Sequence, residues 1–271
     1  MNTPNLVSVF LIFSIMSLSS VSAQEVEEER DFDYLENSGK GPEHWGDLNK
    51  EWAACKNGDL QSPIDMSSHR ATIINNSGYL KTSYKPCAAL LKNRGHDILV
   101  KWPDCDAGSI MINGTDYPLK QAHWHSPSEH TIDGRRYAME LHVVHQSKDP
   151  NLKNNVAVIG VLYRFAEPDA FLSKLMSNIE SMADELEKRE VGVIDPNDII
   201  NLGGDEYYRY MGSLTVPPCS EGVIWIMNKE IGNVSRDQVR ALRKAVHDYA
   251  ETNARPLQPI NHRPIELYSP K

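Results

Sequence analysis

The chain has 271 residues, which suits one large domain or two small ones. Its formal net charge is −9, and the sequence contains no basic cluster that would indicate nucleic-acid binding. This acidity favours solubility but does not identify a partner.

The N-terminus is typical of a targeting segment. Leu6–Leu18 is an apolar stretch too short to span a bilayer, and the small residues Val21, Ser22 and Ala23 follow it. We predict a signal peptide over residues 1–23, with a buried N-terminal helix as the alternative. Residues 24–33 are acidic and predict a flexible mature N-terminus, followed by one domain over residues 34–271. The rest of the chain has no second apolar run, so we expect no membrane anchor.

Short runs typical of β-strands recur along the domain between turn signals. Val156–Phe165 is so apolar that a central position in a sheet is expected. The spacing of apolar residues predicts a helix over Asp169–Arg189, and a capping-box pattern from Ser235 to Gln238 predicts the start of another. The pattern favours one sheet-dominated α+β domain. The predicted strands are Ile98–Trp102, Ser109–Ile112, Lys120–His125, Tyr137–His145, Val156–Phe165 and Gly222–Met227.

Four cysteines behind a signal peptide predict disulfides, and four cysteines allow three pairings. Cys87 and Cys105 flank a hairpin that is expected to turn near residues 93–95, so its strands could bring them together. We favour Cys87–Cys105 and Cys55–Cys219. N-glycosylation sequons begin at Asn75, Asn113 and Asn233.

Three histidines carry the strongest chemical signal. Side chains two positions apart on a strand leave the same face, so His123 and His125 share a face and Trp124 points the other way. Glu140 and His142 share a face of a second predicted strand. If the two strands are neighbours, three imidazoles converge, which is the ligand set of a catalytic zinc site with an open fourth position. Three unrelated histidines are the alternative that this pattern alone leaves open.

Further motifs remove much of that ambiguity. They are Gly41-Pro-Glu-His-Trp45, Ser62-Pro-Ile-Asp65, Asn93-Arg-Gly-His96, Ser128-Glu-His130, Gly212-Ser-Leu-Thr-Val-Pro-Pro-Cys219 and Asn253-Ala-Arg-Pro256. In this order along the chain they closely resemble the α-class carbonic anhydrases, and their residue choices resemble the plant members. The resemblance runs from about Tyr34 to about Leu267. It implies a large central, mostly antiparallel twisted β-sheet with peripheral helices.

The resemblance implies a zinc enzyme. His123, His125 and His142 would bind Zn²⁺, and zinc-bound hydroxide would attack carbon dioxide in a reversible hydration to bicarbonate and a proton. Gln121 and Glu140 would accept hydrogen bonds from His123 and His142, and the backbone near Asn253 would do so for His125. 

The same resemblance assigns the remaining site residues. Thr215 would orient the attacking hydroxide by donating to an ionised Glu129, and His96 would shuttle the proton to solvent. His130 would join a buried hydrogen-bond network with Tyr210 instead of the metal site. The substrate pocket would be lined by Val144, Val158, Leu214, Thr215, Val216 and Trp225.

The sequence departs from the best-known animal enzymes near the proton path. Val216 stands where they carry a second threonine, and Leu99 and Arg94 replace asparagines. We therefore expect an active enzyme whose proton transfer is slower or differently arranged.

Two other functions stay open at this point. A storage, nectar or binding protein of the same fold, as in nectarin- and dioscorin-like relatives, would have little or no hydratase activity. A zinc hydrolase of esters is the other, and the small apolar pocket makes it a side activity. We expect a small-molecule substrate, no nucleic-acid partner and either a monomer or a dimer. The signal peptide predicts the secretory route to the extracellular space, with a plastid as the alternative.

Overall fold

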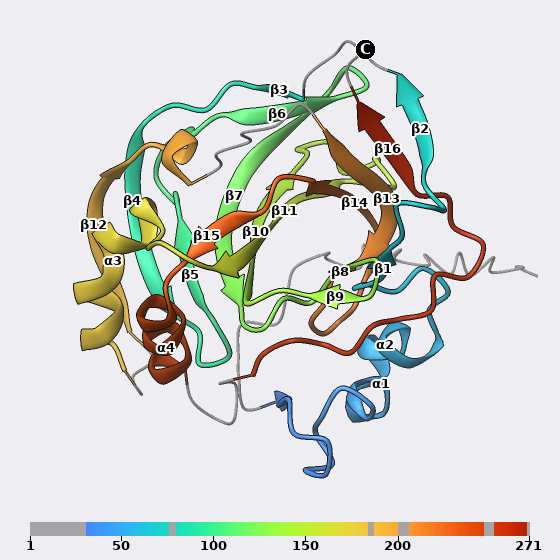
Figure 1. The fold of residues 1–271 in the computed structure, drawn as a ribbon, viewed down its shortest axis with the longest axis horizontal. Coiled ribbons are helices and arrows are strands. Elements are labelled where there is room, and N and C mark those ends of the chain that lie inside the picture. Colours follow the sequence, from blue (N-terminus) through green and yellow to red (C-terminus); the bar gives the residue numbers. More distant parts are fainter. Residues whose placement is uncertain (1–30, 76–79, 184–186, 200–205, 247–251, 270–271) are drawn as a thin grey trace, which may run out of the picture.

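The computed structural model describes residues 31–75, 80–183, 187–199, 206–246 and 252–269 (Figure 1). The predicted signal peptide lies outside these residues. A twisted sheet dominates the fold and curls around the middle of the molecule, while the helices lie at its periphery. No helix in the described ranges is long and apolar enough to cross a membrane.

Within the described residues the main sheet has 13 strands. Its neighbouring strands are mostly antiparallel; β11–β14, β11–β15 and β16–β2 are parallel pairs. This architecture confirms the predicted fold class. Along the sheet the strands are β12 (Lys188–Ile194), β4 (Cys87–Asn93), β5 (Ile98–Lys101), β7 (Thr115–His125), β10 (Met139–Gln146), β11 (Val156–Phe165), β14 (Glu221–Asn228), β13 (Tyr207–Ser213), β16 (Glu266–Ser269) and β2 (Thr72–Asn75).

Shorter elements complete the architecture. Helices α3 and α4 lie side by side near β12, β4 and β5, and α1 and α2 lie beside the C-terminal segment (Figure 1). The extra strands of the main sheet are β15 (Gly232–Val234), β6 (Ser109–Ile112) and β3 (Lys81–Thr82). A small sheet contains β1 (Asp65–Met66), β8 (Thr131–Ile132) and β9 (Arg135–Arg136). The helices are α1 (Trp45–Leu48), α2 (Ala54–Asn57), α3 (Ala170–Ser181) and α4 (Arg236–Ala245), with 3₁₀ turns η2 (Lys50–Trp52) and η3 (Pro196–Asp198).

The predicted helix over Asp169–Arg189 was wrong in its C-terminal part. Asp169 caps the helix by accepting a hydrogen bond from the Leu172 amide, but α3 ends at Ser181. Arg189 instead belongs to β12, which pairs antiparallel with β4. The pairing gives this segment interstrand hydrogen bonds that helical spacing in the sequence does not reveal.

The sheet buries one apolar cluster on each face. Trp124 stacks on Phe171 of α3, with ring centroids 6.3 Å apart, in the cluster beneath the two long helices. Val158 and Trp225 belong to the cluster on the opposite face. Because neighbours on a strand alternate between faces, the helix-covered side anchors the strands while the other side carries His123 and His125.

Both favoured disulfides are present. Cys55–Cys219 joins positions 164 residues apart, with Cα atoms 5.0 Å apart. Cys87–Cys105 spans the β4–β5 hairpin, with Cα atoms 6.3 Å apart. The first bond ties the N-terminal helices to the loop that carries Thr215.

The packed structure begins earlier than the predicted boundary at residue 34. Phe32, expected in the flexible N-terminus, is only 2% exposed. Its ring meets Trp45 edge-on at a centroid distance of 5.3 Å, and Trp52 and Tyr34 complete the cluster. Burial of an aromatic ring outweighs the solubility of the acidic residues before it.

The predicted capping box at the start of α4 is confirmed. Ser235 Oγ accepts from the Gln238 amide at 3.1 Å, and Gln238 Oε1 accepts from the Ser235 amide at 3.1 Å. We expect Ser235→Ala to lower the free energy of unfolding by about 1 kcal/mol and Ser235→Gly by only a few tenths, because glycine leaves the cap open to water. Urea denaturation would measure both; equal losses would contradict a capping role.

Candidate metal centre

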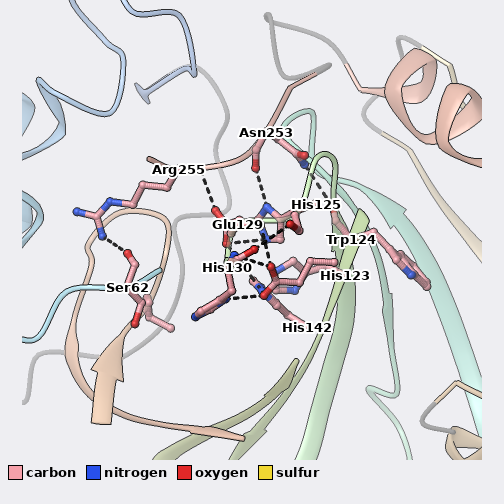
Figure 2. Close-up of polar contacts among 12 residues, drawn as sticks. Ser62, His123, Trp124, His125, Glu129, His130, His142, Asn253 and Arg255 are labelled. Atoms are coloured by element: carbon pink, nitrogen blue, oxygen red, sulfur yellow. Dashed lines mark hydrogen bonds and ion pairs between the residues drawn. The ribbon is translucent and has the colours of Figure 1, made fainter. Parts of the chain in front are cut away.

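Two neighbouring strands bring the three histidines together. In the β7–β10 register His123 lies opposite His142, and His125 lies opposite Glu140. The three rings are in mutual contact, with centroids 4.6 to 5.1 Å apart. Figure 2 shows them converging while Trp124 points away. One nitrogen from each ring lies within 4.8 Å of the others, a spacing that could hold a metal ion.

The hydrogen bonds assign the tautomer of each ring. His123 Nδ1 lies 2.8 Å from Gln121 Oε1, and His125 Nδ1 lies 2.7 Å from the Asn253 carbonyl oxygen. Both partners only accept, so both Nδ1 atoms carry the proton and both Nε2 atoms keep a lone pair. His142 Nε2 donates to Glu140 Oε1 at 2.7 Å, which leaves its Nδ1 lone pair free. Three oriented lone pairs therefore face one point.

The electrostatics of the site favour a positive charge at that point. His125 Nε2 and Glu129 Oε2 are buried without hydrogen-bond partners and lie 3.7 Å apart. Burial acts to lower the pKa of His125, but the Glu129 carboxylate and the Asn253 carbonyl outweigh it and raise that pKa above 6.5. Burial holds the pKa of His123 well below 6.5, so that ring stays neutral. The partnerless His125 nitrogen beside the Glu129 carboxylate fits a divalent cation such as zinc, which would take the place of a proton there.

Glu140 is shared by two histidines. Its Oε1 accepts from His142 at 2.7 Å and from His130 Nδ1 at 2.6 Å. Its Oε2 accepts from the backbone amides of Glu129 and His130, both at 2.8 Å. Burial acts to raise the pKa of Glu140, but these two histidines outweigh it and hold the pKa well below 4.5. An ionised carboxylate on a fully buried strand is thereby satisfied.

Behind Glu140 a chain of hydrogen bonds leads away from the histidines. His130 Nε2 accepts from the Tyr210 hydroxyl at 2.6 Å, and that oxygen lies 2.8 Å from Ser62 Oγ. Both His130 nitrogens are engaged, so the ring fixes Glu140 and offers no lone pair to a metal ion. His130, Glu140 and His142 also lie close enough to hold an ion, but their direct hydrogen bonds occupy the ligand atoms.

Glu129 is fixed by the C-terminal segment. Its Oε1 accepts from the Arg255 backbone amide at 2.9 Å. The expected hydrogen bond from Thr215 to Glu129 is not formed among the described residues; Thr215 is buried on the loop closed by Cys219. Catalytic hydrogen bonds often tighten only when substrate is bound.

The predicted pocket residues divide into two groups. In the sheet register Val144 lies opposite Val158, and Val158 lies opposite Trp225. These three pack in one apolar cluster with Leu214, and the Trp225 ring lies 4.8 Å from that of His142. Val216 instead packs with the N-terminal aromatic cluster.

His96 does not have the environment expected of a proton shuttle. Its side chain is only 3% exposed, and both ring nitrogens lack hydrogen-bond partners. Burial lowers its pKa from 6.5 to about 3, although the neighbouring Asp97 carboxylate acts to raise it. In this conformation the ring cannot exchange protons with solvent near neutral pH.

The role of Arg255 was not predicted from the sequence. Its buried guanidinium donates to the backbone carbonyls of Cys55 and Ser62, both at 2.8 Å, and to Gln61 Oε1 at 2.9 Å. Figure 2 shows its backbone bonded to Glu129 and its side chain reaching towards Ser62. Its place in the Asn253–Pro256 motif was the available signal, but its partners lie 193 to 200 residues away in the sequence.

The sequon asparagines Asn75, Asn113 and Asn233 are all exposed. Asn113 lies at the tight turn between β6 and β7 with a φ of 50°. Asn233 lies in β15, where its Oδ1 accepts from Arg164 at 3.0 Å.

Comparisons with known proteins agree with this geometry. The model of the eukaryotic-type carbonic anhydrase family matches residues 40–269. The chain is 50% identical over 265 residues to Carbonic anhydrase Nec1 of Nesocodon mauritianus, which covers 97% of this chain and 95% of that protein. It is 49% identical over 267 residues to Alpha carbonic anhydrase 7 of Arabidopsis thaliana, with the same coverage.

A similar solved structure is that of dioscorin complexed with ascorbate. It superposes with a TM-score of 0.83 at 40% sequence identity, covering 89% of this chain and 98% of that chain. The fold is therefore shared by named carbonic anhydrases and by dioscorin.

Proposed function

Since the chain belongs to the eukaryotic-type carbonic anhydrase family, we propose that it catalyses the reversible hydration of carbon dioxide to bicarbonate and a proton. The enzyme class predicted from the sequence, a carbonic anhydrase, agrees with that membership. The observation that carries the proposal is the convergence of three histidine lone pairs, each oriented by its own hydrogen-bond acceptor.

His123, His125 and His142 are the residues that would hold Zn²⁺. A zinc ion held there would lower the pKa of a bound water to about 7, the value known for carbonic anhydrases in general, and so supply hydroxide at neutral pH. Gln121, Glu140 and the Asn253 carbonyl keep the three rings in the ligating tautomers. Uncharged ligands leave the full positive charge of the ion available to polarise water.

The apolar side of the site suits carbon dioxide, which has neither net charge nor dipole. Val144, Val158, Leu214 and Trp225 present hydrocarbon and ring surface beside His142. A small apolar wall offers no hydrogen bonds to compete with the reaction, and it excludes bulky substrates. We assign substrate contact to these four residues, whereas Val216 packs in the N-terminal aromatic cluster.

Glu129 and Thr215 would orient the attacking oxygen. The Arg255 amide fixes one carboxylate oxygen of Glu129, and the other, which has no partner, is available to accept from the Thr215 hydroxyl. A hydroxyl that donates to Glu129 can only accept from the attacking oxygen, so a lone pair of that oxygen turns towards carbon dioxide.

The released proton has to reach solvent. Asn253 links the turn that carries His96 to the metal centre. Its Nδ2 donates to the His96 carbonyl at 2.8 Å, and its own carbonyl accepts from His125. We propose that the His96 ring relays the proton from a conformation in which the ring is exposed to water.

The two disulfides are compatible with an oxidising compartment, such as the secretory pathway and the extracellular space. We therefore propose that residues 1–23 direct secretion and that Asn75, Asn113 and Asn233 are glycosylated on the way.

Zinc analysis together with stopped-flow hydration tests the proposal. The chain without residues 1–23 should contain about one zinc per molecule, because the site offers a single set of ligands. Dialysis against a chelator should remove both zinc and hydration, and adding zinc should restore both, whereas added magnesium should not. A folded, oxidised chain that binds no zinc and hydrates no carbon dioxide would contradict the proposal and favour the storage-type alternative, which the similarity to dioscorin keeps relevant.

A further inference from the structure

The His96 ring is buried, contacts Phe32 and lies near Asp97. The ring centroids of Phe32 and His96 are 5.2 Å apart, with the ring planes 52° apart. Asp97 Oδ2 lies 3.9 Å from His96 Nε2, too far for a hydrogen bond. The two orphaned ring nitrogens make this place unfavourable for the ring by itself. Neighbouring residues must therefore hold the His96 ring in this buried position.

The β4–β5 turn holds the backbone of His96. Arg94 and Asp97 flank the turn and form a buried bidentate ion pair, with Nε to Oδ1 at 2.7 Å and Nη2 to Oδ2 at 2.5 Å. Asn93 Oδ1 accepts from the Gly95 amide at 2.8 Å, and Gly95 takes a φ of 85°. Rearrangement of this turn would break the ion pair.

Hydrogen bonds within the N-terminal segment hold Phe32 against the His96 ring. The Trp45 indole Nε1 donates to the carbonyl oxygens of Asp33 at 3.1 Å and Lys40 at 3.0 Å. The Asp33 amide also donates to the Lys40 carbonyl at 3.0 Å. The segment is therefore a hydrogen-bonded loop that places Phe32 over His96.

We propose that Phe32 is a positioning residue for proton release: it keeps His96 away from solvent and has to move before His96 can relay a proton. The inference rests on the proposed function, since the proton is a product of carbon dioxide hydration. The charged and titratable groups around the ring are Asp97 and Arg94 on the turn, Lys92 on β4 and His125 on β7. The charges of Asp97 and Arg94 shift the pKa of the His96 ring in opposite directions, so burial beneath Phe32 keeps the ring neutral.

Nuclear magnetic resonance titration of the His96 ring tests the geometry without any assay of activity. In the wild type the ring should stay neutral down to a pH well below 6.5, since burial holds its pKa at about 3. In Phe32→Ala water reaches the ring, and its pKa should rise towards 6.5. Phe165→Ala, at an exposed phenylalanine of β11, is the matched control and should leave the His96 titration unchanged.

Hydration kinetics test the consequence. In weak buffer the wild type should be limited by proton release and strongly accelerated by added imidazole. Phe32→Ala should be several-fold faster in weak buffer and should respond less to imidazole. Adding His96→Ala to Phe32→Ala should remove that gain, because the gain depends on the freed ring.

Three results would overturn the inference: a His96 ring that already titrates near 6.5 in the wild type, one that stays neutral in a folded Phe32→Ala variant, or a kinetic gain that survives His96→Ala. Phe32→Leu, which keeps apolar packing with a smaller cover, provides the same test with a smaller shift if Phe32→Ala does not fold. Failure of the proposed function would instead show as absent hydration in every variant, while the His96 titration would still report on the cover.

Discussion

His142→Ala is expected to abolish stable zinc binding and, with it, the hydration of carbon dioxide. The variant keeps only the lone pairs of His123 and His125, and it removes the Nε2 donor that satisfies Glu140. Loss of a hydrogen-bonding partner behind a metal ligand typically costs about 10–100-fold in metal affinity, so loss of a ligand itself should exceed about 100-fold. Zinc per chain after dialysis and the stopped-flow rate measure the two losses.

Two variants calibrate that result. Gln121→Ala leaves all three ligands but releases His123 Nδ1, and it should weaken zinc binding by only about 10–100-fold. His44→Ala removes an exposed histidine beside Glu43 and should change neither zinc content nor rate. A His142→Ala chain that retains one zinc and the wild-type rate would show that the site lies elsewhere.

Arg94→Ala is expected to lower the free energy of unfolding by about 3–5 kcal/mol, because it leaves the buried Asp97 carboxylate without its partner. The double change Arg94→Met with Asp97→Val removes both charges and should cost far less, since apolar groups of similar volume can replace a buried ion pair. Urea denaturation of both variants measures the difference. Equal losses would mean that packing, not an unpaired charge, sets the cost.

The same ion pair has a pH signature. Burial acts to raise the pKa of Asp97, but the charge and hydrogen bonds of Arg94 outweigh it and hold that pKa well below 3.8. A carboxyl whose pKa is lowered by folding stabilises the fold above its unfolded pKa, and that contribution is lost as pH falls through the folded value. The stability difference between the wild type and the double variant should therefore be constant above about pH 5 and should shrink below about pH 4.

Local pattern in the sequence was sufficient to place the candidate metal ligands on the faces of their strands, but the pairing of the two strands came from the fold. Side-chain alternation alone places His123 and His125 on one face and Trp124 on the other, because the pleat of a strand has a period of two. The central place of Val156–Phe165 and the cap at Ser235 followed from equally local rules. The helix predicted over Asp169–Arg189 was too long, because helical spacing of apolar residues continues past Ser181. The end of that range pairs with β4 as a strand instead.

The sequence by itself determined which residues could ligate zinc and on which strands they stand, because these depend on residue type and on a period of two. Only the tertiary structure decided what surrounds them: Glu140 shared between His130 and His142, Arg255 anchored to Cys55, and His96 enclosed by Phe32. The contacts of Glu140 with His130 and of Arg255 with Cys55 join positions 10 and 200 residues apart, and the enclosure of His96 depends on burial. Desolvation and hydrogen-bond partners, which set the charge state of a buried group, are properties of the folded chain and have no local signature.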